Sequence, residues 1–355
     1  MRKHYIDNIR WATVIIVLIY HVFYLYNSVG IFGGIGGFSE VQYQDAFLCF
    51  VYPWFMALLF LIAGISSRYA LNRQTHKEFI KDKTAKMLVP STLGLFVYHF
   101  IGGYLNIKFG GGLDSIPSAL VYPISVVSGT GPLWFIQMLY IFSLLLVLIR
   151  KLDSKDRMYE LGKKCNIIVL ILMFLPVFGA SQILNMPVIT TYRFGIYFVV
   201  YLLGYFVFSH DEIQEILSKY HMPLLIIALL MGIGYTIYFF GVNYADAAVL
   251  QHIFTSIYLW FAILAILGCG KAWFDKTSRF ATYMTKSSFG IYIVHYSITL
   301  ILCYILKTYL PIPVALIYIV AIAGVLLLSP AIYELLRRIP VIRYLMFGIK
   351  KRKVG

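Results

Sequence analysis

Stretches of about 20 consecutive apolar residues recur along the whole chain and constrain its fold more than any other feature. A helix needs about 20 mostly apolar residues to cross the hydrocarbon core of a bilayer. Apolar residues run continuously through each stretch, without the alternation of a barrel strand. The ten stretches lie at residues 11–30, 45–66, 88–106, 132–150, 166–184, 191–209, 222–240, 248–268, 287–307 and 313–335. The sequence therefore predicts an all-α polytopic membrane protein, a bundle of about ten transmembrane helices.

The scarcity of charge supports this interpretation. Hydrophobic residues make up 61% of the 355 residues and charged residues only 13%, whereas a typical soluble domain is about a quarter charged. No connection between the stretches is long enough for a soluble domain. We therefore expect residues 1–355 to form a single integral-membrane domain.

The basic residues predict the orientation of the spans. With a cytoplasmic N-terminus, all but three of the 30 Lys and Arg residues fall on the cytoplasmic side, the exceptions being Lys108, Arg193 and Lys307. This positive-inside bias predicts a multi-pass protein of the plasma (cytoplasmic) membrane with both termini in the cytoplasm. The bias also explains most of the net charge of +15 without a nucleic-acid partner. We expect the basic run Lys350–Lys353 to lie against anionic lipid headgroups.

Two histidines lie where the membrane makes ionisable groups costly: His21 in the first span and His295 in the ninth. Arg10 precedes His21 by eleven residues, which places both on one stripe of a helix, within about 20° and about 16 Å apart. An anion-binding guanidinium at the inner mouth and a proton-exchanging imidazole deeper inside would then share a face. The alternative is an arginine that fixes the helix end and a histidine that bonds a neighbouring helix. Asp7 either orients Arg10 or complements the helix dipole.

Five short motifs in order resemble the membrane acyltransferase-3 family over essentially the whole chain. They are Arg10 to His21, Gly64–Ser66, Lys83–Pro90, Gly131–Phe135 and Ser287–His295. Lys83 and Lys86 stand where the family usually has arginines, which keeps the charge but loses the two-pronged geometry of a guanidinium. The chain looks most like the stand-alone branch that includes glucan-modifying succinyl- and acetyltransferases.

This resemblance implies a membrane O-acyltransferase that moves an acetyl or succinyl group. The donor would be cytoplasmic acyl-CoA, and the acceptor a hydroxyl of an extracytoplasmic glucan, polysaccharide or other envelope glycoconjugate. His21 and Arg10 would be catalytic, with His21 either a general base or a transient acyl carrier. The donor-binding candidates are Arg10, Arg68, Arg73, Lys83 and Lys86. Acyl-CoA would be a substrate; no permanently bound cofactor and no metal are expected.

Three further residues are candidates for the acceptor side. Trp134 opens the fourth span and is either a membrane-interface residue or a platform for a sugar ring. Arg193 would hold an anionic acceptor or a lipid headgroup. His295 belongs either to the site or to the packing beside it. The rival hypotheses are a ten-helix transporter or flippase of an envelope precursor, and a structural membrane component; the sequence leaves the oligomeric state open.

Overall fold

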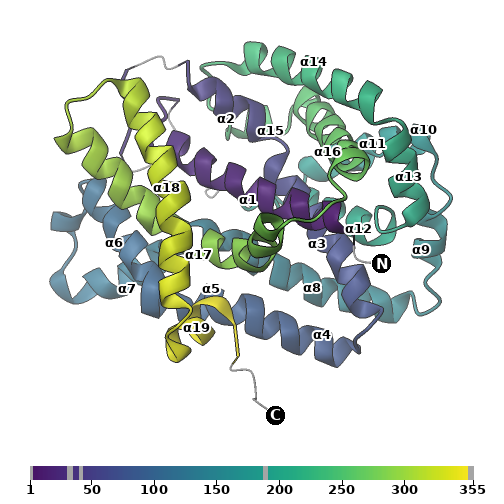
Figure 1. The fold of residues 1–355 in the computed structure, drawn as a ribbon, viewed down its shortest axis with the longest axis horizontal. Helices are drawn as coiled ribbons and strands as arrows, with labels where there is room; N and C mark the ends of the chain where they lie inside the picture. The colour runs from purple at the N-terminus through teal and green to yellow at the C-terminus, as the bar shows by residue number, and fades with distance from the viewer. Residues whose placement is uncertain (1–2, 30–34, 40–42, 187–190, 351–355) are drawn as a thin grey trace. The chain divides into compact units, whose positions relative to one another are not determined.

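The regular structure of the protein is helical throughout the described part of the chain. The structure is a computed structural model that describes residues 3–29, 35–39, 43–186 and 191–350 (Figure 1). Outside the helices it shows a single bridge between Asn185 and Arg193. Lys351–Lys353, most of the basic run predicted to meet lipid headgroups, lies outside the described residues.

Eight helical segments within the described residues are long and apolar enough to cross a membrane. They coincide with predicted spans one to four and seven to ten, which confirms a polytopic bundle of membrane helices. The segments are α1 (His4–Leu25), α2 (Asp45–Val51) with α3 (Phe55–Leu71), the bulged helix α4–α6 (His76–Phe109), η4 (Gly131–Leu133) with α8 (Trp134–Leu152), α14 (His221–Phe239), α16 (Ile253–Trp273), α17 (Arg279–Tyr309) and α18 (Val314–Leu336).

The two remaining predicted spans differ from a simple helix. The stretch 166–184 forms α10 (Ile167–Leu172) and α11 (Phe174–Ser181), which together are shorter than a span. Pro176 explains the interruption, because its ring clashes with the carbonyl of Leu172 four residues earlier. The stretch 191–209 is α12 (Phe194–Phe206), which meets α13 (Asp211–Lys219) at a bend of 104°. By length and composition, the described residues give eight spans, or nine with the bent pair, rather than ten.

The chain divides into two compact units, each assembled from separate segments. Unit 1 comprises Met1–Thr13, Asp45–Ile80 and Ile141–Thr285. In it α3 packs along α12, and α16 packs along both α13 and α14. The shorter helices of unit 1 include α9 (Arg157–Gly162) and α15 (Ala247–Leu250). The helix α4 (His76–Lys83), which starts the bulged helix, begins in the unit 1 segment that ends at Ile80.

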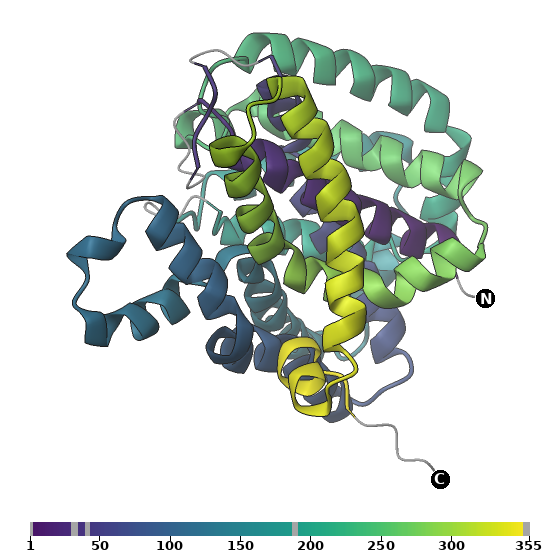
Figure 2. The ribbon, with the colours of Figure 1, turned by 60° about the vertical axis from the view of Figure 1, so that its left-hand side comes forward.

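Unit 2 comprises Val14–Gln44, Lys81–Tyr140 and Lys286–Gly355. Its helix α6 (Phe100–Phe109) pairs with α7 (Ser118–Ser128) in the blue hairpin of Figure 2, and α19 (Pro340–Phe347) packs against α5 (Val89–Gly94). The other short elements are η1 (Thr84–Leu88), η2 (Leu95–His99) and η3 (Leu113–Ser115). The elements η1 and η2 are π-bulges, a feature often found at functional sites.

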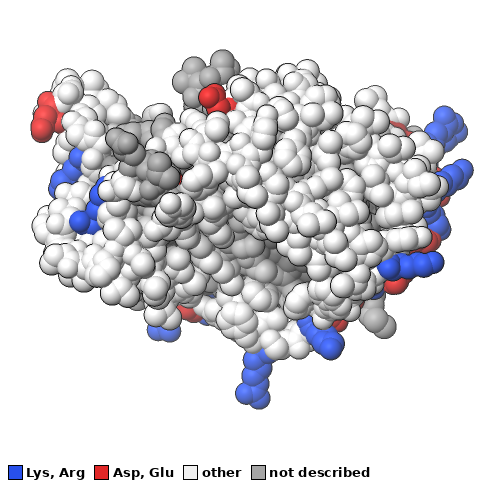
Figure 3. Space-filling view, turned by 90° about the horizontal axis from the view of Figure 1, so that it is seen from above, with Lys and Arg blue, Asp and Glu red and all other residues white. Residues whose placement is uncertain are grey.

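Charged side chains are sparse on the molecular surface. The face drawn in Figure 3 is almost entirely uncharged, and its lysines, arginines and acids lie near the margins. Large apolar side chains such as Leu230, Ile237, Val127 and Leu327 are exposed instead. A surface of this kind suits contact with lipid tails rather than water.

Candidate active site

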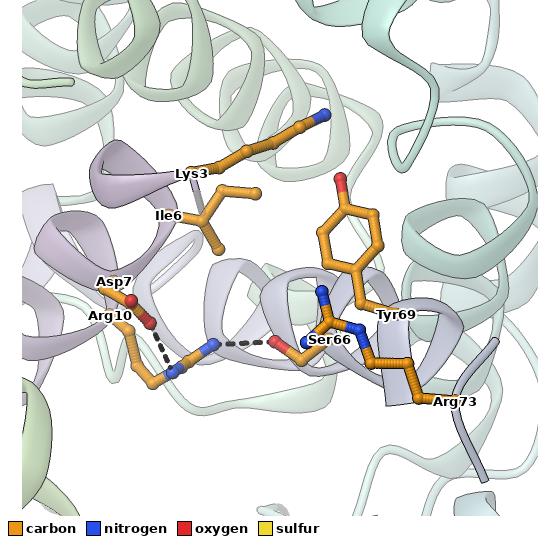
Figure 4. A pocket seen from close by; sticks show the side chains of 7 residues that line it. All are labelled: Lys3, Ile6, Asp7, Arg10, Ser66, Tyr69 and Arg73. Atoms are coloured by element: carbon orange, nitrogen blue, oxygen red, sulfur yellow. Dashed lines mark hydrogen bonds and ion pairs between the residues drawn. The ribbon is translucent and has the colours of Figure 1, made fainter. Parts of the chain in front are cut away.

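Arg10 lines a pocket of about 410 Å³ within unit 1, between the first turns of α1 and the last turns of α3 (Figure 4). The lining residues are Lys3, Ile6, Asp7, Arg10, Ser66, Tyr69 and Arg73. Three of these are cationic and one is a carboxylate. The pocket therefore carries excess positive charge and suits an anionic group.

Asp7 and Ser66 help to hold the Arg10 guanidinium in place. Its Nη1 donates to Oδ1 of Asp7 at 3.0 Å, and its Nη2 donates to Oγ of Ser66 at 2.6 Å (Figure 4). Ser66 in turn donates to the carbonyl of Ile62 at 2.8 Å. Asp7 thus contacts Arg10, as expected from the alternative in which Asp7 orients the guanidinium. Part of the Arg10 side chain, 34%, remains exposed.

The other two cations of the pocket differ in how they are held. Lys3 forms an ion pair with Asp211 and donates to Oε1 of Gln214 at 2.6 Å. Burial lowers the pKa of Lys3, but the hydrogen bond with Asp211 raises it above its ordinary value overall, so the amine stays protonated. Arg73 is exposed, and the described residues give it no ion pair. Its charge is therefore available to a ligand.

His21 and His295 meet inside unit 2, although 274 residues separate them in the sequence. Nε2 of His295 lies 3.2 Å from Nδ1 of His21, and the ring centroids are 4.9 Å apart. His295 is fully buried, whereas His21 is partly accessible. The rings of Tyr24 and Tyr296 contact His21 edge-on. The structure therefore places His295 beside the predicted catalytic histidine.

Arg68 is occupied by partners within unit 1. Its guanidinium pairs with Asp156 at 2.7 Å and lies 3.5 Å from the ring centre of Tyr159. Asp156 also pairs with Arg150, and its φ of 57° is unusual for a residue other than glycine. Only 10% of the Arg68 side chain is exposed. This network accounts for Arg68 without a ligand, and donor binding by Arg68 stays a prediction.

The two predicted donor-binding lysines lie in unit 2, at the first π-bulge. Lys86 is exposed and pairs with Asp82 one turn earlier at 2.8 Å. Lys83 is half-buried at the start of the bulge. Thr84, the first bulge residue, lies with its hydroxyl 3.1 Å from that of Tyr140. Because π-bulges are often found at functional sites, the bulge is compatible with donor binding by these lysines, which stays a prediction.

The predicted acceptor-side residues have different environments. Trp134 is half-buried at the start of α8, where the hydroxyl of Tyr292 donates to the preceding carbonyl of Pro132. Arg193 is only 3% exposed, and its Nη2 donates to the carbonyl of Leu250 at 2.9 Å. The buried position of Arg193 fits a role in fixing the α12 entrance.

Sequence reasoning missed the roles of Lys3, Ser66 and Tyr69 in the pocket. A signal was present, because Ser66 and Tyr69 lie three residues apart and therefore share one face of α3, and Arg73 follows just after the helix ends at Leu71. A polar stripe at the end of an apolar span was the pattern to look for.

The fold and these residues define a multi-pass membrane protein of helical architecture, with a cationic pocket at the start of its first helix and a pair of contacting histidines, His21 and His295. The chain belongs to the acyltransferase-3 family, because the family's acyltransferase-domain model matches residues 3–334. It is therefore a membrane acyltransferase. No match was found among curated proteins or among solved structures.

Proposed function

We propose that this acyltransferase takes an acetyl or succinyl group from cytoplasmic acyl-CoA. The group is transferred to a hydroxyl of an extracytoplasmic glucan, polysaccharide or other envelope glycoconjugate, across the plasma membrane. Membership of the family implies acyl transfer. The proposal adds the identity of the donor, the identity of the acceptor and the side of the membrane on which each is bound. It rests above all on the cationic pocket around Arg10.

The pocket suits the phosphates of coenzyme A. Arg10 is pre-oriented by Asp7 and Ser66, so little side-chain freedom is lost when it binds a phosphate. Arg73 and the protonated Lys3 add positive charge to the lining of the same pocket. Positive charge at an open mouth also attracts a polyanion from solution.

His21 supplies the proton chemistry in this proposal. Its imidazole takes the proton of the acceptor hydroxyl while the oxygen attacks the thioester carbonyl. The tetrahedral intermediate then collapses, the carbon–sulfur bond breaks, and the imidazolium returns the proton to the leaving thiolate. The products are the acyl ester and free coenzyme A. No other proton donor or oxidant is needed.

The first experiment measures free-thiol release by the purified protein in liposomes with acetyl-, succinyl- and longer CoA esters and an envelope glycan. We expect turnover by the wild type and its loss in His21→Gln, which keeps polarity but lacks a base. Arg10→Gln should raise KM for the donor by about 10- to 100-fold, the range for a charge-assisted hydrogen bond. Arg279→Gln is the matched control, because Arg279 is exposed and lies outside the pocket.

A shortened donor tests the phosphate contact directly. Acetyl-pantetheine carries the same thioester as acetyl-CoA but lacks the nucleotide phosphates. Arg10→Gln should therefore raise KM for acetyl-CoA and leave KM for acetyl-pantetheine nearly unchanged. An equal effect on both donors would show that Arg10 does not bind the phosphates. A wild type that releases no thiol from any ester would overturn the assignment of acyl-CoA as the donor.

A further inference from the structure

The contacts of the histidine pair determine which ring nitrogens carry protons. Nδ1 of His295 lies 2.5 Å from the carbonyl oxygen of Tyr292, and Nδ1 of His21 lies 2.8 Å from that of Val17. A carbonyl oxygen only accepts hydrogen bonds, so both Nδ1 atoms must carry hydrogen. A neutral imidazole carries one ring proton, which leaves a lone pair on Nε2 of each histidine.

In the hydrogen bond between the two rings, His21 is then the donor and His295 the acceptor. Nδ1–H of His21 points to two acceptors, the carbonyl of Val17 and Nε2 of His295 at 3.2 Å. If His21 carried its proton on Nε2 instead, its Nδ1 lone pair would face two other lone pairs. The arrangement therefore favours the Nδ1–H form of His21 and leaves its Nε2 as the basic nitrogen. The described residues provide no hydrogen-bond partner for Nε2.

We propose that His295 is a positioning residue that holds His21 in the Nδ1–H form, so that Nε2 of His21 takes the proton from the acceptor hydroxyl. This inference rests on the proposed function, in which His21 is the base. His295 itself gains no proton and touches no reacting atom.

The same contact stabilises the charged state that forms during the reaction. When Nε2 of His21 takes the proton, the ring becomes an imidazolium, and its Nδ1–H still donates to Val17 and His295. A hydrogen bond to a charged group is stronger than the same bond to a neutral one. His295 therefore helps the transition state more than the ground state, which lowers the barrier rather than the donor's KM.

Two substitutions at the same position separate positioning from packing. His295→Leu fills the site but removes the acceptor, whereas His295→Gln places an amide oxygen near the former Nε2. We expect kcat to fall by about 10- to 100-fold in His295→Leu, with KM for acyl-CoA nearly unchanged, and His295→Gln to recover most of the loss. Equal unfolding midpoints in detergent would show that both variants fold. Full kcat in His295→Leu, or no recovery in a folded His295→Gln, would overturn the proposal.

A spectroscopic measurement tests the assignment without turnover. The protein labelled with ¹⁵N-histidine is reconstituted in nanodiscs, and the signals of the pair are identified by their loss in His21→Gln and His295→Gln. Both histidines should show a protonated Nδ1 and an unprotonated Nε2 in the wild type. A proton on Nε2 of either ring would refute the positioning role. The NMR result does not depend on the turnover of a CoA ester. Failure of the proposed function in the thiol-release assay can therefore be distinguished from failure of the His295 assignment.

Discussion

Alanine at Gly64 should destabilise the protein because α3 and α12 approach each other closely at this point. A Cβ added to Gly64 would lie 2.0 Å from the carbonyl oxygen of Tyr201. The approach is reciprocal, because a Cβ on Gly204 of α12 would lie 2.1 Å from the carbonyl oxygen of Leu61 on α3. Small residues that let two helix backbones touch are typical of membrane helix interfaces.

The size of the expected destabilisation follows from the lack of space for a Cβ atom at Gly64. Ordinary contact of a Cβ begins at 3.4 Å, so a gap of 2.0 Å falls short by 1.4 Å, and the obstacle is backbone that cannot rotate away. Overpacking of this kind costs about 1–3 kcal/mol, while the better helix propensity of alanine returns up to about 1 kcal/mol. We expect the free energy of unfolding to fall by about 2 kcal/mol in Gly64→Ala and by a similar amount in Gly204→Ala. The double variant should lose less than the sum, because one separation of the helices relieves both clashes.

The assay is reversible unfolding in mixed micelles with increasing denaturing detergent, followed by circular dichroism. Gly179→Ala is the matched control, because Gly179 is also helical but has nothing within 4 Å of its added Cβ. The control should be neutral or more stable by up to about 1 kcal/mol. Gly64→Ala should also raise KM for the acyl donor, since Ser66 two residues later holds Arg10. Wild-type stability of both interface variants would refute the close approach of α3 and α12.

Three other predictions concern charged groups in unit 1. Asp156→Asn should lower the free energy of unfolding by about 1–3 kcal/mol, because it leaves the nearly buried Arg68 without its charge partner, and denaturant titration would measure the change. Arg73→Gln should raise KM for acyl-CoA several-fold with kcat nearly unchanged, whereas Arg279→Gln should leave both near wild type in the thiol-release assay. The amides of Met158 and Arg157 lower the pKa of Asp153, so its stabilising contribution is present above its ordinary pKa and is lost as pH falls through the lowered value. Asp153→Asn should therefore weaken the acid dependence of unfolding measured by pH titration.

The membrane helices could be predicted from sequence because the bilayer fixes their length and polarity. Eight predicted stretches needed nothing beyond about 20 apolar residues to be found. The stretch 166–184 satisfied the same rule, but Pro176 interrupts it, and a hydropathy average does not register the lost hydrogen bond. The stretch 191–209 ends where the chain turns by 104° into α13, whose amphipathic pattern is not that of a span.

For the candidate site, the spacing of residues within one helix could be predicted from the sequence, whereas contacts between residues on separate helices could not. The spacing of Arg10 and His21 could be used because α1 runs unbroken from His4 to Leu25. The pairing of Arg68 with Asp156 could not be anticipated, because nothing periodic connects residues on separate helices. The sequence analysis placed His295 in the site or beside it, but nothing in a single sequence indicated its direct contact with His21.

The charge balance of the pocket explains why donor binding and acyl selectivity should be separable. Asp7 is the one carboxylate among the described lining residues, which include three cations; Asp7 pairs with Arg10, and Lys3 pairs with Asp211 outside the lining. The pocket therefore favours a polyanion, and the phosphates of coenzyme A lie at the opposite end of the molecule from the acyl group. It follows that Arg10→Gln should raise KM for acetyl-CoA and for succinyl-CoA by the same factor. A larger effect on succinyl-CoA would mean that Arg10 binds the succinyl carboxylate, and the pocket would then have to be assigned to the acyl group instead.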